Sequence, residues 1–537
     1  MNRLDFHHRR HFLLQLSASA SALLLPQSSW SDSHFSHDPF GLGVASGAPT
    51  ADSVVLWTRI LFTAGRDADT AAPVQIRWEI AHNEQFSQMV QSGISTASAS
   101  LAHSVHVEVQ GLEADRWYFY RFRVGDSLSP VGRTRTFPKP DAKVKQLRLA
   151  YASCQKWEDG YFTAWRHMKE ERLDAVMFLG DYIYEYPAFN SKVRTPPGGW
   201  VLTLNDYRQR YALYKSDADL QAMHAACPWL MTWDDHEVQN DYAGTQAGFS
   251  SATDPSDPAE FLSRRAAAYQ AYYEHMPIRL STLKQGLASL VTAETTGAEL
   301  RLYSRVQFGQ LASLYLLDAR QYRDPQVCNK AQAQGSSMVN PAQCATWLDP
   351  KRTLLGQAQE QWLADEFSKN LSKTSFWNVL GQSTLFGQRD FKLGPGQTLW
   401  NDGWDGYAAA RTRLTDGLQK NAVRNPVFLG GDVHENWVGH VKANYADPGS
   451  AAVGVEFCGT SITSRSGGNS KLAERLEENP HFVFADAQRK GYGVVEFTPD
   501  QLTTTLRVVD DVSLKITRIE TLASFRVQNG LSLIERA

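Results

Sequence analysis

The 537-residue chain has almost no excess of charge of either sign, and it contains no long hydrophobic run. Its 54 lysine and arginine residues nearly balance its 57 aspartate and glutamate residues, which leaves a formal net charge of -3. We therefore expect neither a basic nucleic-acid-binding tail nor a basic membrane-binding surface. No stretch approaches the roughly 20 apolar residues that a membrane-spanning helix needs. Because 11% of the residues are aromatic, the chain is too rich in core-forming side chains to be disordered, and its length favours two or more domains.

Cysteine is also scarce, with five residues in the whole chain. Cys328 and Cys344 flank a polar loop rich in Gln, Asn, Ala and Ser, which is the kind of surface loop that a disulfide closes. We predict a Cys328–Cys344 disulfide, which an oxidising compartment would permit. The odd number of cysteines leaves at least one free thiol, and Cys154 is our candidate for a functional one.

The first residues are typical of an export signal. Arg9 and Arg10 precede a short, weakly apolar stretch from Leu13 to Leu25. This pattern resembles a bacterial twin-arginine (Tat) signal, so we assign residues 1–32 to a Tat-type signal peptide. We accordingly expect a periplasmic or secreted protein that uses the Tat export machinery. The alternative is an N-terminal helix that contains an arginine pair by chance.

Residues 38–138 are expected to form a small all-β domain. Their strand-like runs alternate polar residues with Val, Tyr and Trp, and turn-forming residues separate the runs at short intervals, which is typical of a sandwich. The segment from Leu112 to Tyr118 resembles the loop into the tyrosine corner of fibronectin III-like domains, with Tyr118 as the corner residue. Strands are expected at residues 53–60, 74–81, 104–109, 117–124 and 132–137.

From residue 145 the pattern changes to strands that alternate with helices. We assign residues 145–515 to a layered α/β domain and residues 516–537 to a C-terminal extension. Apolar residues at helical spacing predict a helix over residues 162–172. Strands are expected at residues 146–152, 174–179, 227–233, 311–317, 376–380, 426–429, 453–457, 491–497 and 503–509.

Several of these apolar strands end in side chains that commonly bind metals. Ligands of layered α/β folds bind beyond the carboxyl ends of the strands, so these side chains are expected to converge. Adjacent carboxylates such as Asp234 and Asp235 repel each other unless they are exposed or neutralised by a cation. Taken singly, each cluster could form a turn, and each histidine could be an ordinary hydrogen-bonded side chain. Together the clusters predict a polynuclear metal site. The clusters are Cys154, Gly180-Asp181, Asp234-Asp235-His236-Glu237 and Gly431-Asp432-Val433-His434.

In their order along the chain, these motifs resemble those of the PhoD-type alkaline phosphatases, which belong to the calcineurin-like metallophosphoesterase superfamily. The resemblance runs from the β domain to about residue 465. It implies an α/β fold, in which a layered αββα metallophosphoesterase domain follows a small immunoglobulin- or fibronectin III-like sandwich. It also implies an alkaline phosphatase or phosphodiesterase that hydrolyses phosphate monoesters and diesters. The matching segments are Phe40–Gly47, Val55–Arg59, Ser153–Gln155, Gly180–Glu185, Trp233–Glu237, Leu317–Gln321, Trp404–Tyr407 and Gly431–His434.

The resemblance also implies roles for individual residues around a ferric ion. Asp181 would bridge two metals, and His434 would complete the first metal site. Cys154 as thiolate and Tyr184 as phenolate would bind Fe(3+), because a hard trivalent cation lowers the pKa of both groups enough to deprotonate them.

The second metal would be Ca(2+). The resemblance places Asp235 where the wider superfamily has an asparagine ligand and Asp432 where it has a histidine, and exchanging these ligands for carboxylates shifts the preference toward calcium. His236 would act as the catalytic residue that stabilises or protonates the leaving oxygen while a metal-activated hydroxide attacks phosphorus. Asn240 is a possible calcium contact. Arg320 would either hold a phosphate oxygen or pair with Asp318.

The motifs are also compatible with two other functions. One is a phospholipase D-like or purple acid phosphatase-like hydrolase with the same core. The Asp-x-His that usually opens a dinuclear purple acid phosphatase site is replaced by Ser153-Cys154-Gln155, which argues against that type. Another is a non-catalytic periplasmic protein with a structural metal site that binds a polymer. We expect a monomer whose substrate is a small-molecule or polymeric phosphoester.

Overall fold

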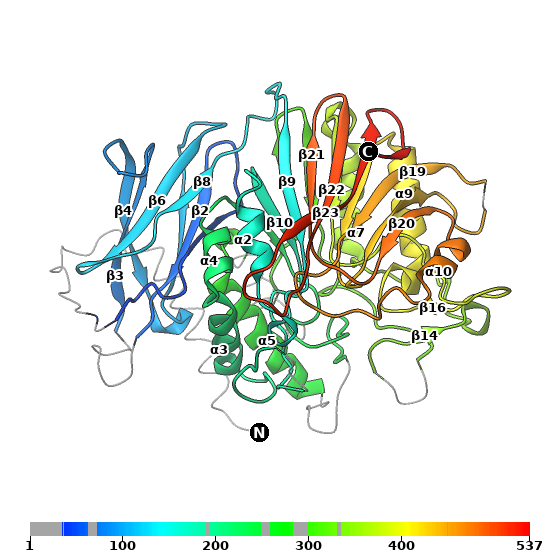
Figure 1. Ribbon diagram of the computed structural model, residues 1–537, viewed down its shortest axis with the longest axis horizontal. Helices are drawn as coiled ribbons and strands as arrows, with labels where there is room; N and C mark the ends of the chain where they lie inside the picture. Colours follow the sequence, from blue (N-terminus) through cyan, green and yellow to red (C-terminus); the bar gives the residue numbers. More distant parts are fainter. Residues whose placement is uncertain are drawn as a thin grey trace.

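The computed structural model describes residues 35, 37–62, 72–189, 193–248, 258–282, 299–329, 334–447 and 449–537. The predicted signal segment lies outside these residues. Figure 1 shows the N-terminal strands at one end of the molecule and strands β19 and β20 with helices α9 and α10 at the other. Among the described helices, none is long and apolar enough to cross a membrane.

Two large β-sheets form the centre of the molecule. The first has ten strands, in the order β24-β23-β22-β21-β9-β10-β11-β1-β2-β5, and the second has seven, in the order β12-β13-β15-β17-β19-β18-β20. The strands of the first sheet are β1 (Val44–Gly47), β2 (Val54–Arg59), β5 (Ser104–Val109), β9 (Leu147–Ala152), β10 (Ala175–Leu179), β11 (Trp229–Thr232), β21 (Lys490–Phe497), β22 (Gln501–Val509), β23 (Ile519–Gln528) and β24 (Ile534–Arg536). Those of the second are β12 (Ser304–Phe308), β13 (Ala312–Leu316), β15 (Trp377–Gly381), β17 (Pro426–Gly430), β18 (Asn436–Lys442), β19 (Ala452–Cys458) and β20 (Phe482–Asp486).

The central strands are apolar on both faces because each face packs against another layer. In β10, Met177 and Leu179 belong to the core between the two sheets, whereas Val176 and Phe178 face the opposite side. Successive residues of a strand point to opposite faces, so one continuous apolar run supplies both cores.

Helices cover the outer faces of both sheets. Side chains of α2, α3, α4 and α5 share a core with β9, β10 and β11, and side chains of α7 and α9 share another with β13, β15 and β17. The four layers confirm the predicted αββα fold. The helices are α2 (Thr163–Lys169), α3 (Leu204–Lys215), α4 (Ala218–His224), α5 (Pro258–His275), α7 (Gln357–Ser368), α8 (Asn370–Thr374), α9 (Ala408–Lys420) and α10 (Leu472–Glu478), with short 3-10 helices η2 (Ala99–Leu101), η3 (Trp157–Asp159), η4 (Pro341–Gln343) and η5 (Trp404–Tyr407).

Local sequence signals set the starts of α3 and α4. At the start of α3, the Thr203 hydroxyl accepts a hydrogen bond from the backbone N–H of Asp206, whose carboxylate accepts one from the backbone N–H of Thr203. The carboxylate of Asp217 accepts hydrogen bonds from two backbone N–H groups at the start of α4. These caps satisfy N–H groups that have no partner inside the helix.

The N-terminal region forms the predicted sandwich. A five-stranded sheet packs across an apolar core against β1, β2 and β5. The hydroxyl of Tyr118 accepts a hydrogen bond from the backbone N–H of Glu113 at 2.9 Å, as a tyrosine corner does. The strands of the five-stranded sheet are β3 (Val74–Ala81), β4 (Met89–Ala97), β6 (Trp117–Val124), β7 (Ser127–Leu128) and β8 (Gly132–Arg135).

The sandwich is continuous with the strands of the α/β region, because β1 pairs in parallel with β11. Gly47 of β1 lies opposite Trp229 of β11. A Cβ atom on Gly47 would overlap the carbonyl oxygen of Pro277 and lie 2.8 Å from the carbonyl oxygen of Trp229. Only glycine permits this close approach. The indole N–H of Trp57 also donates to the carbonyl of Glu274 in α5 at 3.0 Å. The sandwich is therefore built into the main body rather than attached only through the chain.

Residues 516–537 do not form a separate extension, which corrects the domain boundary set from the sequence. Strand β23 pairs with β22 along its length, and β24 pairs with β23 at the edge of the ten-stranded sheet. Ala523, Phe525 and Val527 contribute to the core between the two sheets. The alternation of apolar and polar residues in β23 is the signal that sequence reasoning passed over.

The loop that carries two of the cysteines is closed by a covalent bond. The Sγ atoms of Cys328 and Cys344 are bonded, and the two Cα atoms lie 5.9 Å apart. Strand β14 (Met338–Val339) lies within this loop and pairs with β16 (Leu399–Trp400), which comes much later in the chain. Cys154, Cys227 and Cys458 are free and buried.

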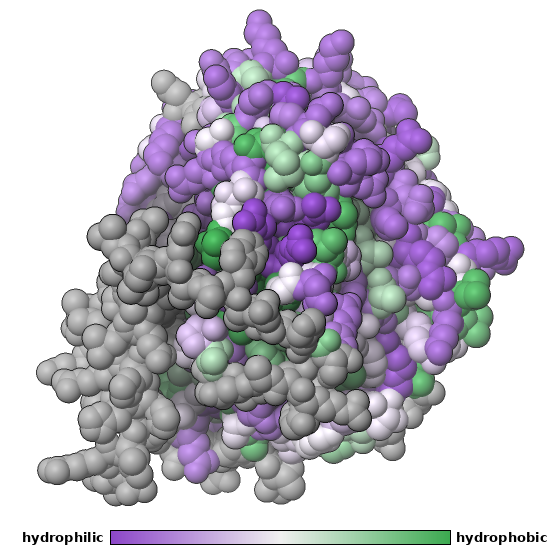
Figure 2. All heavy atoms as spheres, turned by 90° about the vertical axis from the view of Figure 1, so that its left-hand side faces the viewer, coloured by the Kyte–Doolittle hydropathy of each residue, from purple (hydrophilic) through white to green (hydrophobic). Residues whose placement is uncertain are grey.

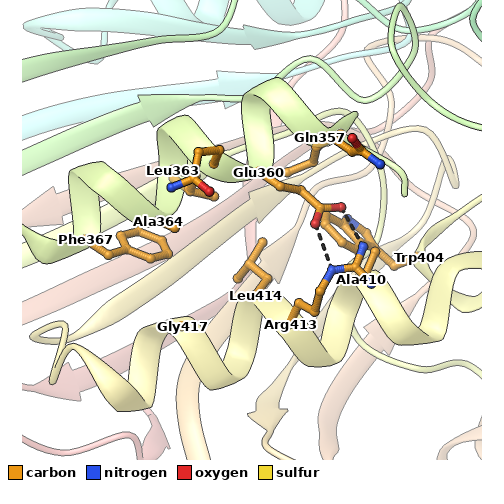
Figure 3. Close-up of a pocket in the computed structure, with 12 residues that line it drawn as sticks. Gln357, Glu360, Leu363, Ala364, Phe367, Trp404, Ala410, Arg413, Leu414 and Gly417 are labelled. Carbon is orange, nitrogen blue, oxygen red and sulfur yellow. Dashed lines mark hydrogen bonds and ion pairs between the residues drawn. The ribbon is translucent and has the colours of Figure 1, made fainter. Parts of the chain in front are cut away.

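Two surface features lie apart from the strand ends. A cleft of about 330 Å³ separates α7 from α9, and in Figure 3 Glu360 of α7 reaches across to Arg413 of α9, with an Oε2–Nε distance of 2.8 Å. Figure 2 views the molecule from the side of the N-terminal strands and shows mainly hydrophilic residues, with hydrophobic ones in small separate groups. The predicted metal ligands are not among the residues that line the cleft.

Candidate metal centre and active site

Loops from both sheets meet at the carboxyl ends of four strands. Cys154 follows β9, Asp181 follows β10, Asp235 follows β11 and Asp432 follows β17. Strands β9, β10 and β11 are parallel neighbours in one sheet, so their carboxyl ends lie at the same edge. Strand β17 brings the fourth loop from the facing sheet. The convergence expected from the sequence is thus a property of the fold.

Four of the predicted metal ligands have a left-handed backbone conformation. The φ angles are 58° at Cys154, 59° at Asp181, 64° at Asp432 and 57° at His434. A non-glycine residue in this region costs on the order of 1–3 kcal/mol, and such residues cluster at functional sites. The fold therefore stores strain at the ends of these strands.

One group of candidate ligands consists of Cys154, Asp181 and His434, whose donor atoms lie within 4.8 Å of one another. The hydroxyl of Tyr184 donates to Oδ2 of Asp181 at 2.8 Å and lies 3.2 Å from Nε2 of His434. Ser464 supports this group, because its hydroxyl lies 2.7 Å from the Tyr184 hydroxyl and donates to the carbonyl of Cys154 at 2.8 Å. One thiol, one carboxyl, one imidazole and one phenol thus surround a common point.

A hydrogen bond fixes the orientation of the His434 ring. Its Nδ1 lies 2.8 Å from the carbonyl oxygen of Arg465. Because a carbonyl only accepts, Nδ1 carries the proton and Nε2 presents its lone pair to the site. Metal-binding histidines are commonly oriented in this way by a partner of the other ring nitrogen.

A second group consists of Asp181, Asp235 and His236, again with donor atoms within 4.8 Å of one another. Asp181 belongs to both groups, as a bridging ligand must. The carboxylate of Glu185 lies 2.7 Å from Nδ1 of His236, which leaves Nε2 available. The ring of Tyr184 lies over that of His236, with 4.1 Å between their centroids.

Asp432 lies near these groups but outside both of them. The hydroxyl of Thr384 donates to its Oδ2 at 2.7 Å. Burial, together with the negative charge of Asp234, raises the pKa of Asp432 well above its ordinary value. The backbone N–H of Asn240 donates to Glu185 at 2.8 Å, and the predicted calcium contact of its side chain stays a prediction.

The guanidinium of Arg320 pairs with carboxylates other than Asp318, and its predicted phosphate contact stays a prediction. Arg320 is only 1% exposed, and its guanidinium forms ion pairs with Asp234 at 2.5 Å and Asp402 at 2.7 Å. Its Nη2 atom lies 3.6 Å from Asp235. Asp318 contacts the backbone N–H of Arg320 rather than the guanidinium. Arg320 therefore supplies positive charge beside the adjacent carboxylates of Asp234 and Asp235.

A third acidic group, of Asp235, Asp241 and Asp402, was not predicted. Asp402 is paired with two arginines, Arg320 and Arg323. Burial and the neighbouring carboxylates raise the pKa of Asp241 to about 7. Much of the negative charge of this group is thus balanced within the protein.

The first two groups fit a cation. Oδ1 of Asp181 is buried and accepts no hydrogen bond from the described residues. Burial and nearby negative charge raise the pKa of Asp181, Cys154 and Tyr184 well above the ordinary values. A buried acceptor without a partner is costly, and a cation would satisfy it while favouring the ionised form of all three groups.

Several supporting residues were missed by sequence reasoning. Glu185 orients His236, Thr384 binds Asp432, and Ser464 supports Tyr184. Glu237 accepts hydrogen bonds from the backbone N–H groups of three residues in the neighbouring loops. Glu185 and Glu237 stand inside the recognised motifs, so their position was visible although their role was not. Thr384 follows a buried strand with no distinctive pattern around it.

Comparison with known proteins identifies the family. The PhoD-like phosphatase family matches residues 149–506, and the N-terminal domain of PhoD-like phosphatases matches residues 26–138. Alkaline phosphatase D of Bacillus subtilis (strain 168) is 44% identical over 506 residues, which cover 92% of this chain and 82% of the relative. A solved structure described as the structure of PhoD has a TM-score of 0.84 and 42% identity, and the match covers 94% of this chain and 93% of that one.

These similarities, together with the buried ligand groups, make the chain a metal-dependent hydrolase of phosphoesters. It belongs to the PhoD-like phosphatase family. The resemblance that the motifs indicated is confirmed, as are the fold class and the enzyme class.

Proposed function

We propose that this protein is an exported enzyme that hydrolyses phosphate monoesters and diesters with one ferric and one calcium ion. The observation that carries the proposal is the shared position of Asp181, which contributes to both groups of candidate ligands. Cys154, Tyr184 and His434 would hold the ferric ion with Asp181. Asp235 and Asp432, with Asn240 as a further contact, would hold the calcium ion.

The types of donor support this choice of metals. A thiol and a phenol bind a trivalent cation when that cation displaces their protons. Carboxylate oxygens suit calcium, which prefers oxygen ligands. When bound, the two metals would supply positive charge beside the phosphoryl oxygens and would lower the pKa of water, so that hydroxide is available to attack phosphorus.

The chain's own residues have separate tasks around the phosphoryl group. Nε2 of His236 points away from Glu185 and is available to give a proton to the departing oxygen. Glu185 holds the imidazole in this orientation and so acts as a positioning residue. Lys490, which donates to the carbonyl of His434 at 2.7 Å, holds the loop that carries the His434 imidazole.

The test of the calcium site uses bis(p-nitrophenyl) phosphate as substrate. We expect a calcium-selective chelator to abolish hydrolysis and added calcium to restore it. Hydrolysis that is indifferent to the chelator would overturn calcium as the second metal while leaving a phosphoesterase. Absence of hydrolysis before chelation, in protein with its full metal content, would overturn the function itself.

The test of the iron site has a spectroscopic readout besides activity. A phenolate bound to a ferric ion absorbs visible light by charge transfer. We expect the loaded protein to be coloured, Tyr184→Phe to lose the band, and Cys154→Ser to shift it. A colourless protein that contains iron and is fully active would contradict the assignment of Tyr184.

Export through the Tat machinery is proposed from the arginine pair alone. Substituting both Arg9 and Arg10 with lysine should stop export while leaving the activity of the retained protein intact. Unchanged export would contradict the Tat assignment. Light scattering of the mature protein tests the expected monomer.

A further inference from the structure

The loop between Glu185 and Val201, described except for residues 190–192, carries a cluster of aromatic rings beside His236. The ring of Tyr186 meets the His236 ring edge to face, with 5.1 Å between centroids. Trp200 packs edge to face against Tyr186 at 5.5 Å, and Phe189 packs against Trp200 at 5.6 Å. We call Tyr186, Phe189 and Trp200 the aromatic cluster.

The aromatic cluster extends from the His236 ring to the solvent-exposed surface. At its inner end, Nζ of Lys156 lies 5.6 Å from the ring centroid of Tyr186. At its outer end, Phe189 is 59% exposed, which is unusual for a phenylalanine side chain that packs against other rings. A ligand held at His236 could therefore rest a ring against the cluster without displacing any buried side chain.

A buried arginine fixes the backbone that carries these rings. Arg210 of α3 is 3% exposed, and its guanidinium donates to the carbonyl oxygens of Tyr184 and Tyr186, with a distance of 2.8 Å to Tyr186. It also reaches the carbonyl of Gly199, next to Trp200, at 3.4 Å. One buried cation thus ties together the two ends of the loop, so the cluster is arranged before a ligand arrives.

We propose that the aromatic cluster is a leaving-group subsite that binds a planar ring on the departing alcohol of a phosphodiester. This inference rests on the proposed function, because it places the departing oxygen at His236. The oxygen of a water molecule forms the new bond to phosphorus and the water loses a proton to solvent, while the bond from phosphorus to the ring-bearing alcohol breaks. The departing oxygen takes a proton from His236, which regains one from solvent. The class of substrate selected is a diester with an aryl, benzyl-type or nucleoside alcohol.

The physical reason is stacking on preformed rings. Each aromatic pair adds binding free energy beyond that from the buried area. This corresponds to about a two- to tenfold preference for an alcohol with a planar ring over one without a ring. Because the rings lie on the side of His236, the preference should act on which alcohol leaves. A cyclic but non-planar group should gain less.

The test uses one substrate that offers two leaving groups of similar acidity. Benzyl methyl phosphate can release benzyl alcohol or methanol, and the ratio of the two products is set inside one active site. The ratio does not depend on enzyme concentration or on metal occupancy. It is measured for the metal-loaded wild-type protein and for Phe189→Leu and Trp200→Leu, which keep apolar side chains but remove the rings. Leu128→Ala, at an exposed leucine of β7 in the sandwich, is the control.

We expect the wild-type protein to favour benzyl alcohol by three- to tenfold, and each ring variant to lower the ratio by about threefold. The ratio for Leu128→Ala should equal that of the wild type. An unchanged ratio in both ring variants, or a wild-type preference for methanol, would overturn the inference. If Trp200→Leu does not fold, the exposed position Phe189 decides the outcome alone.

The inference and the proposed function fail in different ways. Hydrolysis of bis(p-nitrophenyl) phosphate with an unaltered product ratio would leave the function in place and remove only the subsite. Loss of all phosphoester hydrolysis by the metal-loaded wild-type protein would remove both.

Discussion

In the N-terminal sandwich the buried side chains are mainly apolar, whereas in the strand-end loops many of them are ionisable. Val54 and Leu56 of β2 are completely buried among other apolar residues. Asp181, Asp234 and Asp235, by contrast, are each no more than 3% exposed and lie close together. The two regions belong to one continuous sheet, through β1 and β11.

This difference separates the parts of the molecule that stabilise the fold from those that cost stability. Burying apolar surface is favourable, whereas burying a carboxylate without a full set of partners is not. The left-handed residues at the site add strain. Substitutions should therefore have opposite effects in the two regions. At the site they should lower activity and raise the stability of the metal-free protein. In the sandwich they should lower stability and leave kcat/KM unchanged.

The largest expected effect is that of Asp181→Asn. Because Asp181 is the ligand shared by both groups, we expect kcat/KM to fall on the order of 10³-fold and bound metal to be lost. Burial and nearby negative charge raise the pKa of the Asp181 carboxyl in the folded protein. Above the ordinary pKa of aspartate the unfolded chain ionises this group more readily than the fold does, so the group destabilises the metal-free fold near pH 7. A neutral amide removes this cost, and the metal-free variant should unfold at higher denaturant concentration than the metal-free wild type near pH 7.

Three measurements on Asp181→Asn test the comparison together: metal content, kcat/KM and denaturant unfolding after metal removal. Retained turnover with a full complement of metal would contradict the role of Asp181. A metal-free variant less stable than the metal-free wild type would contradict the claim that this site costs stability.

Gly47→Ala is the matching substitution in the N-terminal sandwich, where we expect stability rather than activity to fall. The added Cβ would overlap the carbonyl oxygen of Pro277 and press on that of Trp229, where β1 meets β11. Overpacking of this kind costs about 1–3 kcal/mol, so the midpoint of unfolding should fall while kcat/KM per folded molecule stays within about twofold. Gly467→Ala, where an added Cβ meets no atom within 4 Å, is the control. Equal stability of the two variants would show that β1 does not brace the catalytic sheet.

Glu185→Gln should have a smaller effect on activity than removing a ligand. The carboxylate orients His236 from 2.7 Å, and loss of such a partner costs about 10- to 100-fold in activity. A merely structural role would lower the amount of folded protein, whereas a positioning role should lower kcat and change its pH profile with little change in KM. Glu456→Gln is a matched control, because Glu456 is also buried and accepts two backbone N–H groups. An equal loss of kcat in both variants would contradict the positioning role.

The sequence predicted five strands of the N-terminal region because their residues alternate between core and solvent, but it missed β1, β4 and β7. The ranges 74–81, 104–109 and 117–124 match β3, β5 and β6 at both ends. The pairing of β1 with β11 could not be predicted in this way, since the two strands are far apart in the chain and carry no local signal of their partnership. The same holds for the docking of β23 and β24.

At the site, the position of residues after buried strands was enough to indicate convergence. The structure does bring Cys154, Asp181 and His434 together. What the sequence could not reveal is how buried charges are compensated, because Arg320 reaches Asp402 across a separation of many residues. Supporting hydroxyls such as that of Thr384 are equally invisible, because serine and threonine are common everywhere in the chain.

The smallest predicted effect concerns Tyr118, a buried polar group of the sandwich that the sequence did single out. Its hydroxyl accepts from the backbone N–H of Glu113 at 2.9 Å, and Tyr118→Phe would leave that N–H without this partner. We expect a loss of about 1 kcal/mol in the free energy of unfolding, with kcat/KM unchanged, as measured by denaturant unfolding and by hydrolysis of bis(p-nitrophenyl) phosphate. Tyr120→Phe is the control, because the buried hydroxyl of Tyr120 has no hydrogen-bond partner among the described residues and its removal should be neutral or stabilising. If the two variants lose stability equally, ring packing rather than the corner hydrogen bond stabilises this end of the sandwich.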